Sequence, residues 1–508
     1  MKFSRCSGIL LHFTSLPGKF GVGDLGPPAY EFADFLSNAG SKLWQVLPIN
    51  PTGYGDSPYQ CFSAFAGNPI LLSLERLRDQ GLLQESELAR APSFREDCVE
   101  YGPVIEFKMA ALRRAAKVFF SDASGTDRAL FHRFCESEKK WLDDYALFMA
   151  CKDAHHGNAW TSWDAGIRKR DSQAISEWSQ KLAGEILAYK YWQFEFFRQW
   201  HDLKAHCLKR NLKFMGDIPI YVAHDSADVW AHPDLFSLDE NGRPAVVSGV
   251  PPDYFSATGQ FWGNPIYRWD RLAATGYQWW IERFRSSLAL FDLVRLDHFR
   301  GFESYWAVPA TETTAINGHW IRGPGEELFA ALQNVLGDLP IVAENLGVIT
   351  PAVENLRRQF GFPGMGVLQF AFGSDPQASS FRPHNYNRDL AAYTGGHDND
   401  TTVGWWSSSG SADSTRTADD VRKEHEFARA YLNLRDDSEI NWVMIRMVLA
   451  SVADIAIVPL QDVLGLGSEG RMNLPGKVSG NWRWRYLPTA LSGNLSAKLR
   501  ELVALYDR

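Results

Sequence analysis

Eight short apolar runs bounded by turn residues constrain the fold of this chain more than any other feature. The runs are continuous, without alternation of polar and apolar residues, which is typical of parallel strands buried on both faces. Segments with helical periodicity lie between several of them. Eight strands alternating with helices predict an α/β fold, a (β/α)8 TIM barrel. The predicted strands lie in SGILLHF (7–13), KLWQVLP (42–48), LKFMGDIPI (212–220), FDLVRLDHF (291–299), LPIVAENL (339–346), GVLQFAF (366–372), LAAYTGG (390–396) and DIAIVPLQ (454–461).

The length of the chain predicts large insertions in this barrel. A bare barrel needs about 250 residues, whereas the chain has 508. Residues 72–210 are helical in pattern and predict a mainly helical inserted subdomain. Residues 221–290 are richer in Pro, Gly and aromatic residues and predict a lid or wall over the site. We therefore expect one catalytic barrel domain over 1–508 that carries both insertions.

Charge and composition exclude several classes of protein. The net charge is −8, from 52 Lys and Arg against 60 Asp and Glu, which argues against a general nucleic-acid binder. There is no apolar run long enough for a membrane helix, and the apolar stretch from Gly8 to Phe13 is too short for a signal-peptide core. The six cysteines are scattered without CxxC spacing, which predicts reduced thiols in a cytoplasmic protein and no zinc site.

Charged residues follow several of the predicted strands at their carboxyl ends, where barrel enzymes place their active sites. Because an unpaired carboxylate is costly to bury, the convergence of several at one rim suggests a function. These residues are Asp217, Arg295, Asp297, Glu344, His397 and Asp398.

The spacing of Arg295 and Asp297 places both side chains on one face of a strand. A guanidinium beside Asp297 would keep that carboxylate ionised, as a nucleophile requires; a structural salt bridge is the alternative. Glu344 follows a strongly apolar strand, and partial desolvation would raise its pKa toward that of a general acid. The alternative for Glu344 is a pair with a neighbouring Arg or a helix cap.

The segment HDNDTT, residues 397–402, has three interpretations. It is typical of a turn that leads into a helix N-cap, with Asp400 or Thr401 as the cap while His397 and Asp398 face the site. One His and two Asp could also bind a metal, but the first strand offers only His12 as a partner. We expect no metal and no other cofactor.

Two carboxylates with separate roles are the outline of glycoside chemistry. A retaining enzyme holds them about 5–5.5 Å apart, and neighbouring strands could supply that spacing. The chain also contains 19 Trp, 17 Tyr and 32 Phe. Flat aromatic rings suit sugars, although many could simply fill a core.

Several motifs resemble those of the amylomaltases, the 4-alpha-glucanotransferases of glycoside hydrolase family 77. They run through almost the whole chain: SGILLHFTSLPG (7–18), NPTGYGDSPYQ (50–60), GDIPIYV (216–222), GVPPDYFSATGQFWGNPIY (249–267), VRLDHFRGFESYW (294–306), VAENLG (342–347), HDNDTT (397–402) and RMNLPG (471–476).

The resemblance implies a barrel without a C-terminal β domain, and transfer of α-1,4-glucan segments between maltooligosaccharides by double displacement with retention. It also implies three catalytic carboxylates: Asp297 as nucleophile, Glu344 as acid and base, and Asp398 as the group that binds hydroxyls of the cleaved ring. The implied partners are maltooligosaccharides and α-1,4-glucans such as starch or glycogen fragments. We expect no nucleic acid, no membrane, and a monomer or a weak homodimer.

The same resemblance implies a set of substrate-binding residues, among them a loop from Asp253 to Asn264 that covers the acceptor side. Separately, the segment 249–267 is aromatic enough to serve as a lid that excludes water, which is our hypothesis. The set comprises Ser57, Tyr59, Asp217, Asp253, Tyr254, Phe255, Gln260, Trp262, Asn264, Arg295, His397 and Asn473. Tyr54 and Tyr101 resemble a secondary glucan-contact surface.

Three other functions compete with this interpretation. An α-amylase-type retaining hydrolase would use the same carboxylates and differ in its products. A glucan-binding protein without catalysis would not need an acid and a nucleophile. A metal-dependent barrel hydrolase would be sensitive to chelators.

Overall fold

The computed structural model describes residues 4–252, 256–409, 417–477 and 479–508. Eight parallel strands form one sheet, in the order β10-β11-β12-β1-β2-β3-β6-β9. The strands are β1 (Cys6–Leu10), β2 (Leu43–Gln45), β3 (Lys213–Ile218), β6 (Leu293–Leu296), β9 (Ile341–Ala343), β10 (Gly364–Val367), β11 (Leu390–Tyr393) and β12 (Ile455–Pro459). Six of them lie within the predicted apolar runs, β1 begins one residue before its run, and β10 begins two residues before its run and overlaps it only at its last two residues. The predicted barrel is confirmed.

The barrel is nearly closed between β9 and β10. The backbone N–H of Ala343 donates to the carbonyl of Pro363 at 2.8 Å, and the side chain of Asn345 accepts from the N–H of Met365 at 2.8 Å. Because every strand is parallel, all eight carboxyl ends lie at one rim.

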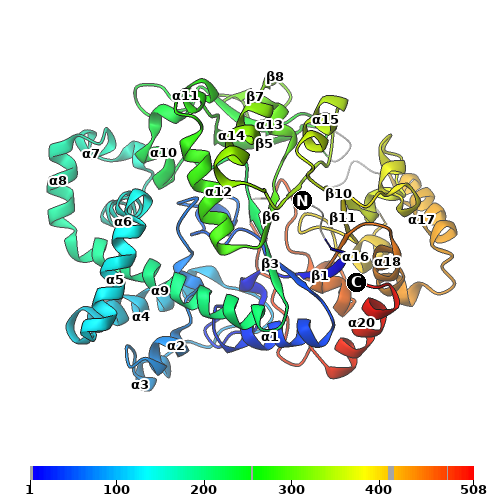
Figure 1. Ribbon diagram of the computed structural model, residues 1–508, viewed down its shortest axis with the longest axis horizontal. Coiled ribbons are helices and arrows are strands. Elements are labelled where there is room, and N and C mark those ends of the chain that lie inside the picture. The colour runs from blue at the N-terminus through cyan, green and yellow to red at the C-terminus, as the bar shows by residue number, and fades with distance from the viewer. Residues whose placement is uncertain (1–3, 253–255, 410–416, 478) are drawn as a thin grey trace.

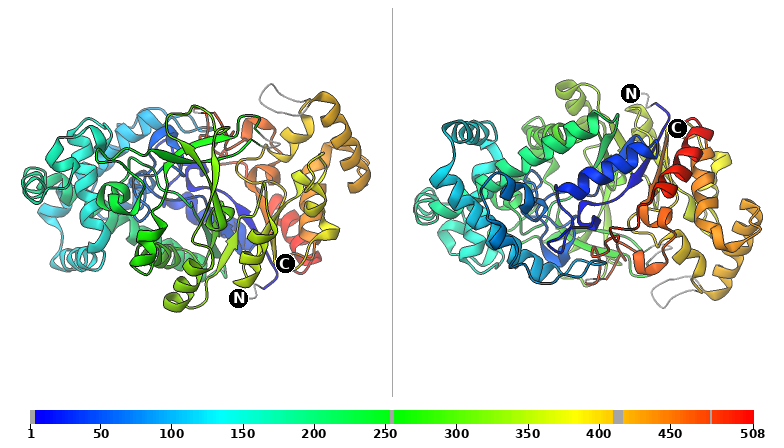
Figure 2. Two further views of the ribbon diagram at one scale, coloured as in Figure 1. Left: turned by 90° about the horizontal axis from the view of Figure 1, so that it is seen from above. Right: turned by 90° about the horizontal axis from the view of Figure 1, so that it is seen from below.

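Helices surround the barrel and extend it at both ends (Figures 1 and 2). They are α1 (Pro27–Asn38), α2 (Leu74–Asp79), α3 (Glu85–Leu88), α4 (Tyr101–Asp122), α5 (Gly125–Ser137), α6 (Lys139–Ala154), α7 (Ala165–Arg168), α8 (Ser172–Lys181), α9 (Ala183–Leu208), α10 (Ala227–Ala231), α11 (Trp269–Ala274), α12 (Gln278–Leu290), α13 (Arg300–Glu303), α14 (Glu326–Leu336), α15 (Pro351–Gln359), α16 (Thr402–Ser407), α17 (Ala418–Leu432), α18 (Ile440–Ala450), α19 (Leu460–Leu464) and α20 (Gly493–Leu505).

Helices α2 to α9 fill the long gap between β2 and β3. Figure 2 shows α4 to α8 at one end of the molecule and α17 at the other, with the barrel between them. Helix α9 is the link to the barrel: it packs on α4, α5 and α6 as well as on α1 and β3. Neighbouring residues such as Tyr191, Trp192 and Phe194 are therefore all buried, because partners surround the helix. The limits 72–210 and 221–290 for the inserted subdomains stay predictions.

A smaller antiparallel sheet stands beside the barrel rim, in the order β5-β4-β7-β8. Its strands are β4 (Val246–Val250), β5 (Gln260–Pro265), β7 (Ser304–Pro309) and β8 (His319–Arg322). Two of them belong to the 221–290 segment, and the other two follow β6. The four-stranded sheet was not predicted, because its strands are short and two lie after the expected end of the insertion.

Much of the aromatic content fills the core rather than the surface. Trp44 on β2 is fully buried and lies 4.9 Å from the ring centre of Phe13 and 5.1 Å from that of Phe214. Trp200 of α9 joins this cluster at 4.8 Å from Phe214. Composition alone therefore overstates the number of rings available to a sugar.

Arg5, just before β1, and Arg508 come together at the amino-terminal side of the barrel strands, opposite the rim formed by their carboxyl ends. Helix α18 ends there, and its last carbonyls have no partners within the helix. The guanidinium of Arg508 donates to the carbonyl oxygens of Leu449 at 2.8 Å and Ala453 at 2.6 Å, and Arg5 donates to the same two. Two cations at the negative end of a helix dipole favour this arrangement.

Each of the six cysteines is free, four of them buried, in agreement with the predicted reduced thiols. None of the helices within the described part of the chain is long and apolar enough to cross a membrane.

Candidate active site

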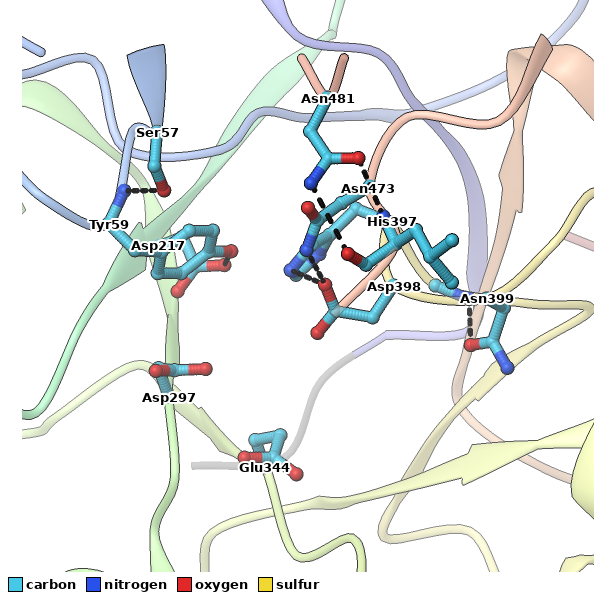
Figure 3. Close-up of polar contacts among 12 residues, drawn as sticks. Ser57, Tyr59, Asp217, Asp297, Glu344, His397, Asp398, Asn399, Asn473 and Asn481 are labelled. Carbon is cyan, nitrogen blue, oxygen red and sulfur yellow. Dashed lines mark hydrogen bonds and ion pairs between the residues drawn. The ribbon is translucent and has the colours of Figure 1, made fainter. Parts of the chain in front are cut away.

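Strand ladders place the principal charged side chains at one rim of the barrel. Asp217 on β3 pairs in register with Arg295 on β6. The backbone N–H of Asp297 donates to the carbonyl of Ile218 at 3.0 Å, and that of Glu344 donates to Leu296 at 3.0 Å. Each carboxylate thus continues the ladder of its own strand, and the side chains of Asp217, Asp297 and Glu344 come together (Figure 3).

Arg295 is the centre of this cluster. Its guanidinium contacts Asp217 at 2.7 Å and Asp297 at 2.8 Å, and it lies 4.0 Å from Glu344. The side chain is only 7% exposed, and its carboxylate neighbours hold its pKa well above the usual value against the effect of burial. The expected pair of Arg295 and Asp297 is therefore present, as part of a cluster in which one cation faces three carboxyl groups.

Glu344 is the candidate proton donor of the cluster. Burial raises its pKa to about 8, Arg295 opposes this increase, and the nearby Asp297 adds to it. Protonation of one carboxyl group relieves the excess of negative charge around a single guanidinium. The two oxygens of Glu344 accept the backbone N–H groups of His298 at 2.7 Å and Leu346 at 3.1 Å, which fixes the carboxyl group in place.

Asp297 is more open than its neighbours. Its side chain is 22% exposed, against 11% for Glu344 and 0% for Asp217. Burial raises the pKa of Asp217 as well, but its oxygens accept from Arg295 and from the hydroxyl of Tyr59 at 2.8 Å. We therefore assign Asp217 as a fixed partner of the guanidinium and Asp297 as the carboxylate that a ligand can reach.

Asp398 faces the cluster from the other side of the rim, in the loop after β11 (Figure 3). Its carboxylate accepts from the side chain of Asn473 at 2.6 Å, and its Oδ1 lies 3.4 Å from Nε2 of His397. Burial lowers the pKa of His397, so the ring is neutral near pH 7. Thr401 caps helix α16 by accepting from the N–H of Gly404 at 2.9 Å. The same segment thus contains both the helix cap and the site residues, as the sequence suggested.

Tyr59 connects the two sides of the rim. Besides its bond to Asp217, its ring stacks on His397 with centres 5.1 Å apart, and Trp482 packs against both rings. Burial holds the pKa of Tyr59 well above its usual value, so the hydroxyl remains a donor. Ser57 accepts the backbone N–H of Tyr59 at 3.2 Å and shapes this segment.

The predicted acceptor-side segment is only partly described. Asp253, Tyr254 and Phe255 lie outside the described residues. Trp262 on β5 packs edge-on against His298 with ring centres 4.8 Å apart, and its indole N–H donates to Gln260 at 3.1 Å. Asn264 is buried, and its side chain donates to the carbonyl of Val222 at 3.0 Å, so its predicted contact with substrate stays a prediction.

The two tyrosines of the predicted secondary surface differ in exposure. Tyr54 is 79% exposed and offers its ring to solvent. Tyr101 is buried at the start of α4, and its hydroxyl donates to the carbonyl of Trp482 at 2.8 Å. Of this pair, the structure leaves only Tyr54 available as a contact surface.

Three residues of the rim were missed by the sequence analysis. His298 provides the N–H for Glu344 and is a neutral ring, because burial lowers its pKa to about 4. Arg471 donates to the backbone carbonyls of Asp398 at 2.7 Å and Asn473 at 2.8 Å. His298 and Arg471 lie inside quoted motifs, which was the available signal. Trp482 had none beyond its aromatic character.

The metal interpretation of residues 397–402 gains no support. Within the described ranges, no three His, Cys, Asp or Glu side chains are arranged to hold a metal ion. His12 is buried, and burial lowers its pKa to about 3.

Known proteins match this chain over nearly its whole length. The family model described as 4-alpha-glucanotransferase, of glycoside hydrolase family 77, matches residues 11–490. A 4-alpha-glucanotransferase from Synechocystis sp. is 52% identical over 99% of this chain and 98% of its own. One from Thermus thermophilus is 50% identical over the full length of both chains.

The fold comparison agrees. The structure of amylomaltase from Streptococcus agalactiae in complex with acarbose matches with a TM-score of 0.93 at 38% identity, over 99% of each chain. The amylomaltase of Corynebacterium glutamicum, at 19% identity, shares the fold with a TM-score of 0.78, over 99% of this chain and 75% of its own. The barrel, the motifs and the matches agree: this chain belongs to the 4-alpha-glucanotransferase family, glycoside hydrolase family 77.

Proposed function

We propose that this enzyme transfers α-1,4-glucan segments from one maltooligosaccharide to another through a covalent intermediate on Asp297. One observation carries the proposal. Asp297 and Glu344 follow adjacent strands around one guanidinium, the first reachable and paired with Arg295, the second buried with a raised pKa. A nucleophile and a proton donor side by side are what retention at a glycosidic carbon requires.

In the first half of the reaction, Asp297 attacks the anomeric carbon of the donor. Glu344 gives its proton to the departing glycosidic oxygen, which leaves with the reducing-end part of the donor. Arg295, at 2.8 Å, pairs with Asp297 and aligns its carboxylate. The result is a glucosyl ester on Asp297 and an ionised Glu344.

In the second half, the 4-hydroxyl of an acceptor glucan gives its proton to Glu344 and attacks the anomeric carbon. The ester bond breaks and Asp297 returns as a carboxylate. Two inversions give overall retention. Asp398, held by Asn473, lies where it can accept hydrogen bonds from hydroxyls of the reacting sugar and favour its distortion toward the transition state.

Transfer needs the ester to meet a sugar hydroxyl before water. The contact between Trp262 and His298 places an indole ring over the catalytic loop after β6. An apolar surface at this position removes space for water and offers a stacking face to an acceptor sugar. The hydrolase alternative is not favoured, because the similar chains named above are 4-alpha-glucanotransferases.

The product pattern from maltotriose tests this function. We expect longer oligosaccharides to form together with glucose and maltose, while the number of reducing ends stays nearly constant. Chromatography of products over time, with a parallel reducing-end assay, measures both. Shorter products alone with a steady rise in reducing ends would show a hydrolase and contradict the proposal.

The pKa of Glu344 sets the pH dependence of the reaction. Because the first step needs the protonated form, and burial raises this pKa to about 8, kcat/KM should be retained through neutral pH. It should fall about tenfold per pH unit above that value. Initial rates of maltotriose disproportionation from about pH 5 to about pH 10 measure this decline. A decline that begins below about pH 6 would mean that the acid has an ordinary pKa and that our assignment is wrong.

We further propose that the substrates include starch or glycogen fragments, that the enzyme acts as a monomer or a weak homodimer, and that it works in the cytoplasm. Six free cysteines support a reducing compartment. Sedimentation of the purified protein tests the oligomeric state.

A further inference from the structure

The outer face of the four-stranded sheet carries a row of aromatic side chains. In the antiparallel register, Phe261 on β5 lies opposite Gly249 on β4, Gly249 opposite Trp306 on β7, and Trp306 opposite Trp320 on β8. Residues directly opposite one another project from the same face of a sheet. Phe261, Trp306 and Trp320, here called the Trp320 row, therefore cross the whole sheet on one face.

The rings at the two ends of the row are open to solvent. Trp320 is 39% exposed and Phe261 is 37% exposed. Neighbouring strands lie about 4.8 Å apart, so the two end positions, three strand spacings from each other, are separated by about 14 Å. Gly249 adds no side chain between Phe261 and Trp306, and the buried Ala315 packs over this position.

Contacts within the protein hold the tryptophans of the row in place. The guanidinium of Arg300 lies 3.6 Å from the ring centre of Trp320 and covers one of its faces. The ring of Trp306 packs edge-on against Trp320 at 5.1 Å, and its indole N–H donates to the carbonyl of Ala315 at 2.8 Å. A ligand that stacks on such fixed rings loses little protein entropy on binding.

We infer that the Trp320 row binds α-1,4-glucan at a site separate from the catalytic rim. Flat, fixed aromatic rings match the C–H faces of glucose units. The exposed side chain of Arg322, two residues along β8 on the same face, supplies hydrogen-bond donors for hydroxyl groups at the margin. The inference rests on the proposed function, which makes α-1,4-glucan the ligand at the neighbouring rim.

The position of the row favours a glucan over a partner protein. Phe261 precedes Trp262 on β5, so one strand carries a ring of the row and the ring that contacts His298. Arg300, under Trp320, also donates to the carbonyl of Val348, in the segment after Glu344. Figure 1 places β7 and β8 beside α13 and α15, the elements of that side of the rim. Because consecutive side chains of a strand point to opposite faces, the row lies on the other face of the sheet from Trp262. A glucan that occupies the row therefore passes the edge of the sheet or binds there as a separate chain.

Comparison of a long and a short substrate distinguishes binding at this site from binding at the catalytic site. Replacing Trp320 by alanine should weaken retention of the protein in a native gel containing amylose, by about five-fold in apparent dissociation constant. The KM for amylose should rise by a similar factor with kcat unchanged, while kcat and KM for maltotriose stay at wild-type values. Trp320→Phe, which keeps a flat ring, should recover most of the retention. Phe261→Ala should show a smaller loss of retention.

Leu208→Ala is the matched control, because Leu208 is an apolar side chain at the end of α9 that is 70% exposed. Unchanged retention of Trp320→Ala would overturn the inference. A parallel loss of maltotriose transfer would also overturn it, because the row would then belong to the catalytic site or to the folding core. A change in sedimentation of Trp320→Ala with unchanged retention would instead indicate contact with a second copy of the chain. Wild-type protein that is retained by amylose but inactive on maltotriose would refute the proposed function and leave the row as a glucan site.

Discussion

Replacement of Asp297 by asparagine is expected to lower kcat for maltotriose disproportionation by at least about 10⁴-fold. The amide has nearly the shape of the carboxylate, so the contact with Arg295 and the ladder bond to Ile218 should survive. An amide cannot form the glycosyl ester, and only positioning and proton donation remain. Product formation from maltotriose measures the loss, and calorimetric titration with a maltooligosaccharide should show binding retained.

Asp270→Asn is the control for this variant. Asp270 is a surface carboxylate, 63% exposed, that pairs with Arg268 at 2.7 Å, so the same chemical change is made at an arginine-paired position outside the catalytic cluster. It should leave kcat within a factor of about two. Activity of Asp297→Asn within about tenfold of wild type would remove Asp297 from the role of nucleophile.

Replacement of Glu344 by glutamine should have an effect that depends on the leaving group. With maltotriose, whose glycosidic oxygen needs a proton, we expect kcat to fall by about 10³-fold. With maltosyl fluoride as donor, formation of the ester should be much less affected, because fluoride departs without a proton. Comparison of the two donors under single-turnover conditions measures the difference, and the decline of activity above about pH 8 should disappear.

Glu439→Gln, at an exposed glutamate paired with Lys498, is the control and should behave like wild type with both donors. An equal loss of Glu344→Gln activity with maltotriose and with maltosyl fluoride would argue for a positioning role. In that case the carboxyl group would hold the loop through the N–H groups of His298 and Leu346 rather than transfer a proton.

The framework of this site could be predicted because it follows from local pattern. Each barrel strand is a continuous apolar run, and a parallel barrel brings the carboxyl ends of its strands to one rim. Asp297 and Glu344 follow such runs directly. To predict that they converge, it was therefore enough to count the strands and to follow the alternation of side chains along each strand.

Other parts of the site and of the fold depend on contacts between segments that are distant in the sequence, and such contacts cannot be predicted from a local pattern. Asn473 holds Asp398 from a loop after β12, and Trp482 closes the wall behind Tyr59. Tyr101 is a further example. It resembles a residue of a secondary glucan-contact surface, but its ring is buried and its hydroxyl donates to the carbonyl of the distant Trp482. Strand β7 was missed because it pairs with β4, from which the barrel strand β6 separates it in the sequence, and β8 joins the sheet through β7.

The central claim of a covalent intermediate on Asp297 can be tested directly by trapping it. A maltosyl fluoride with a second fluorine on its sugar ring slows both half-reactions, because fluorine destabilises an oxocarbenium-like transition state. In Glu344→Gln the second half-reaction is slower still, so the ester should accumulate. Trypsin cleaves after Arg295 and Arg300 and releases residues 296–300, LDHFR, in which Asp297 is the only carboxylate side chain. We predict one maltosyl unit on this peptide by mass spectrometry. An adduct on the peptide of residue 344 or 398, or turnover without any adduct, would contradict the account.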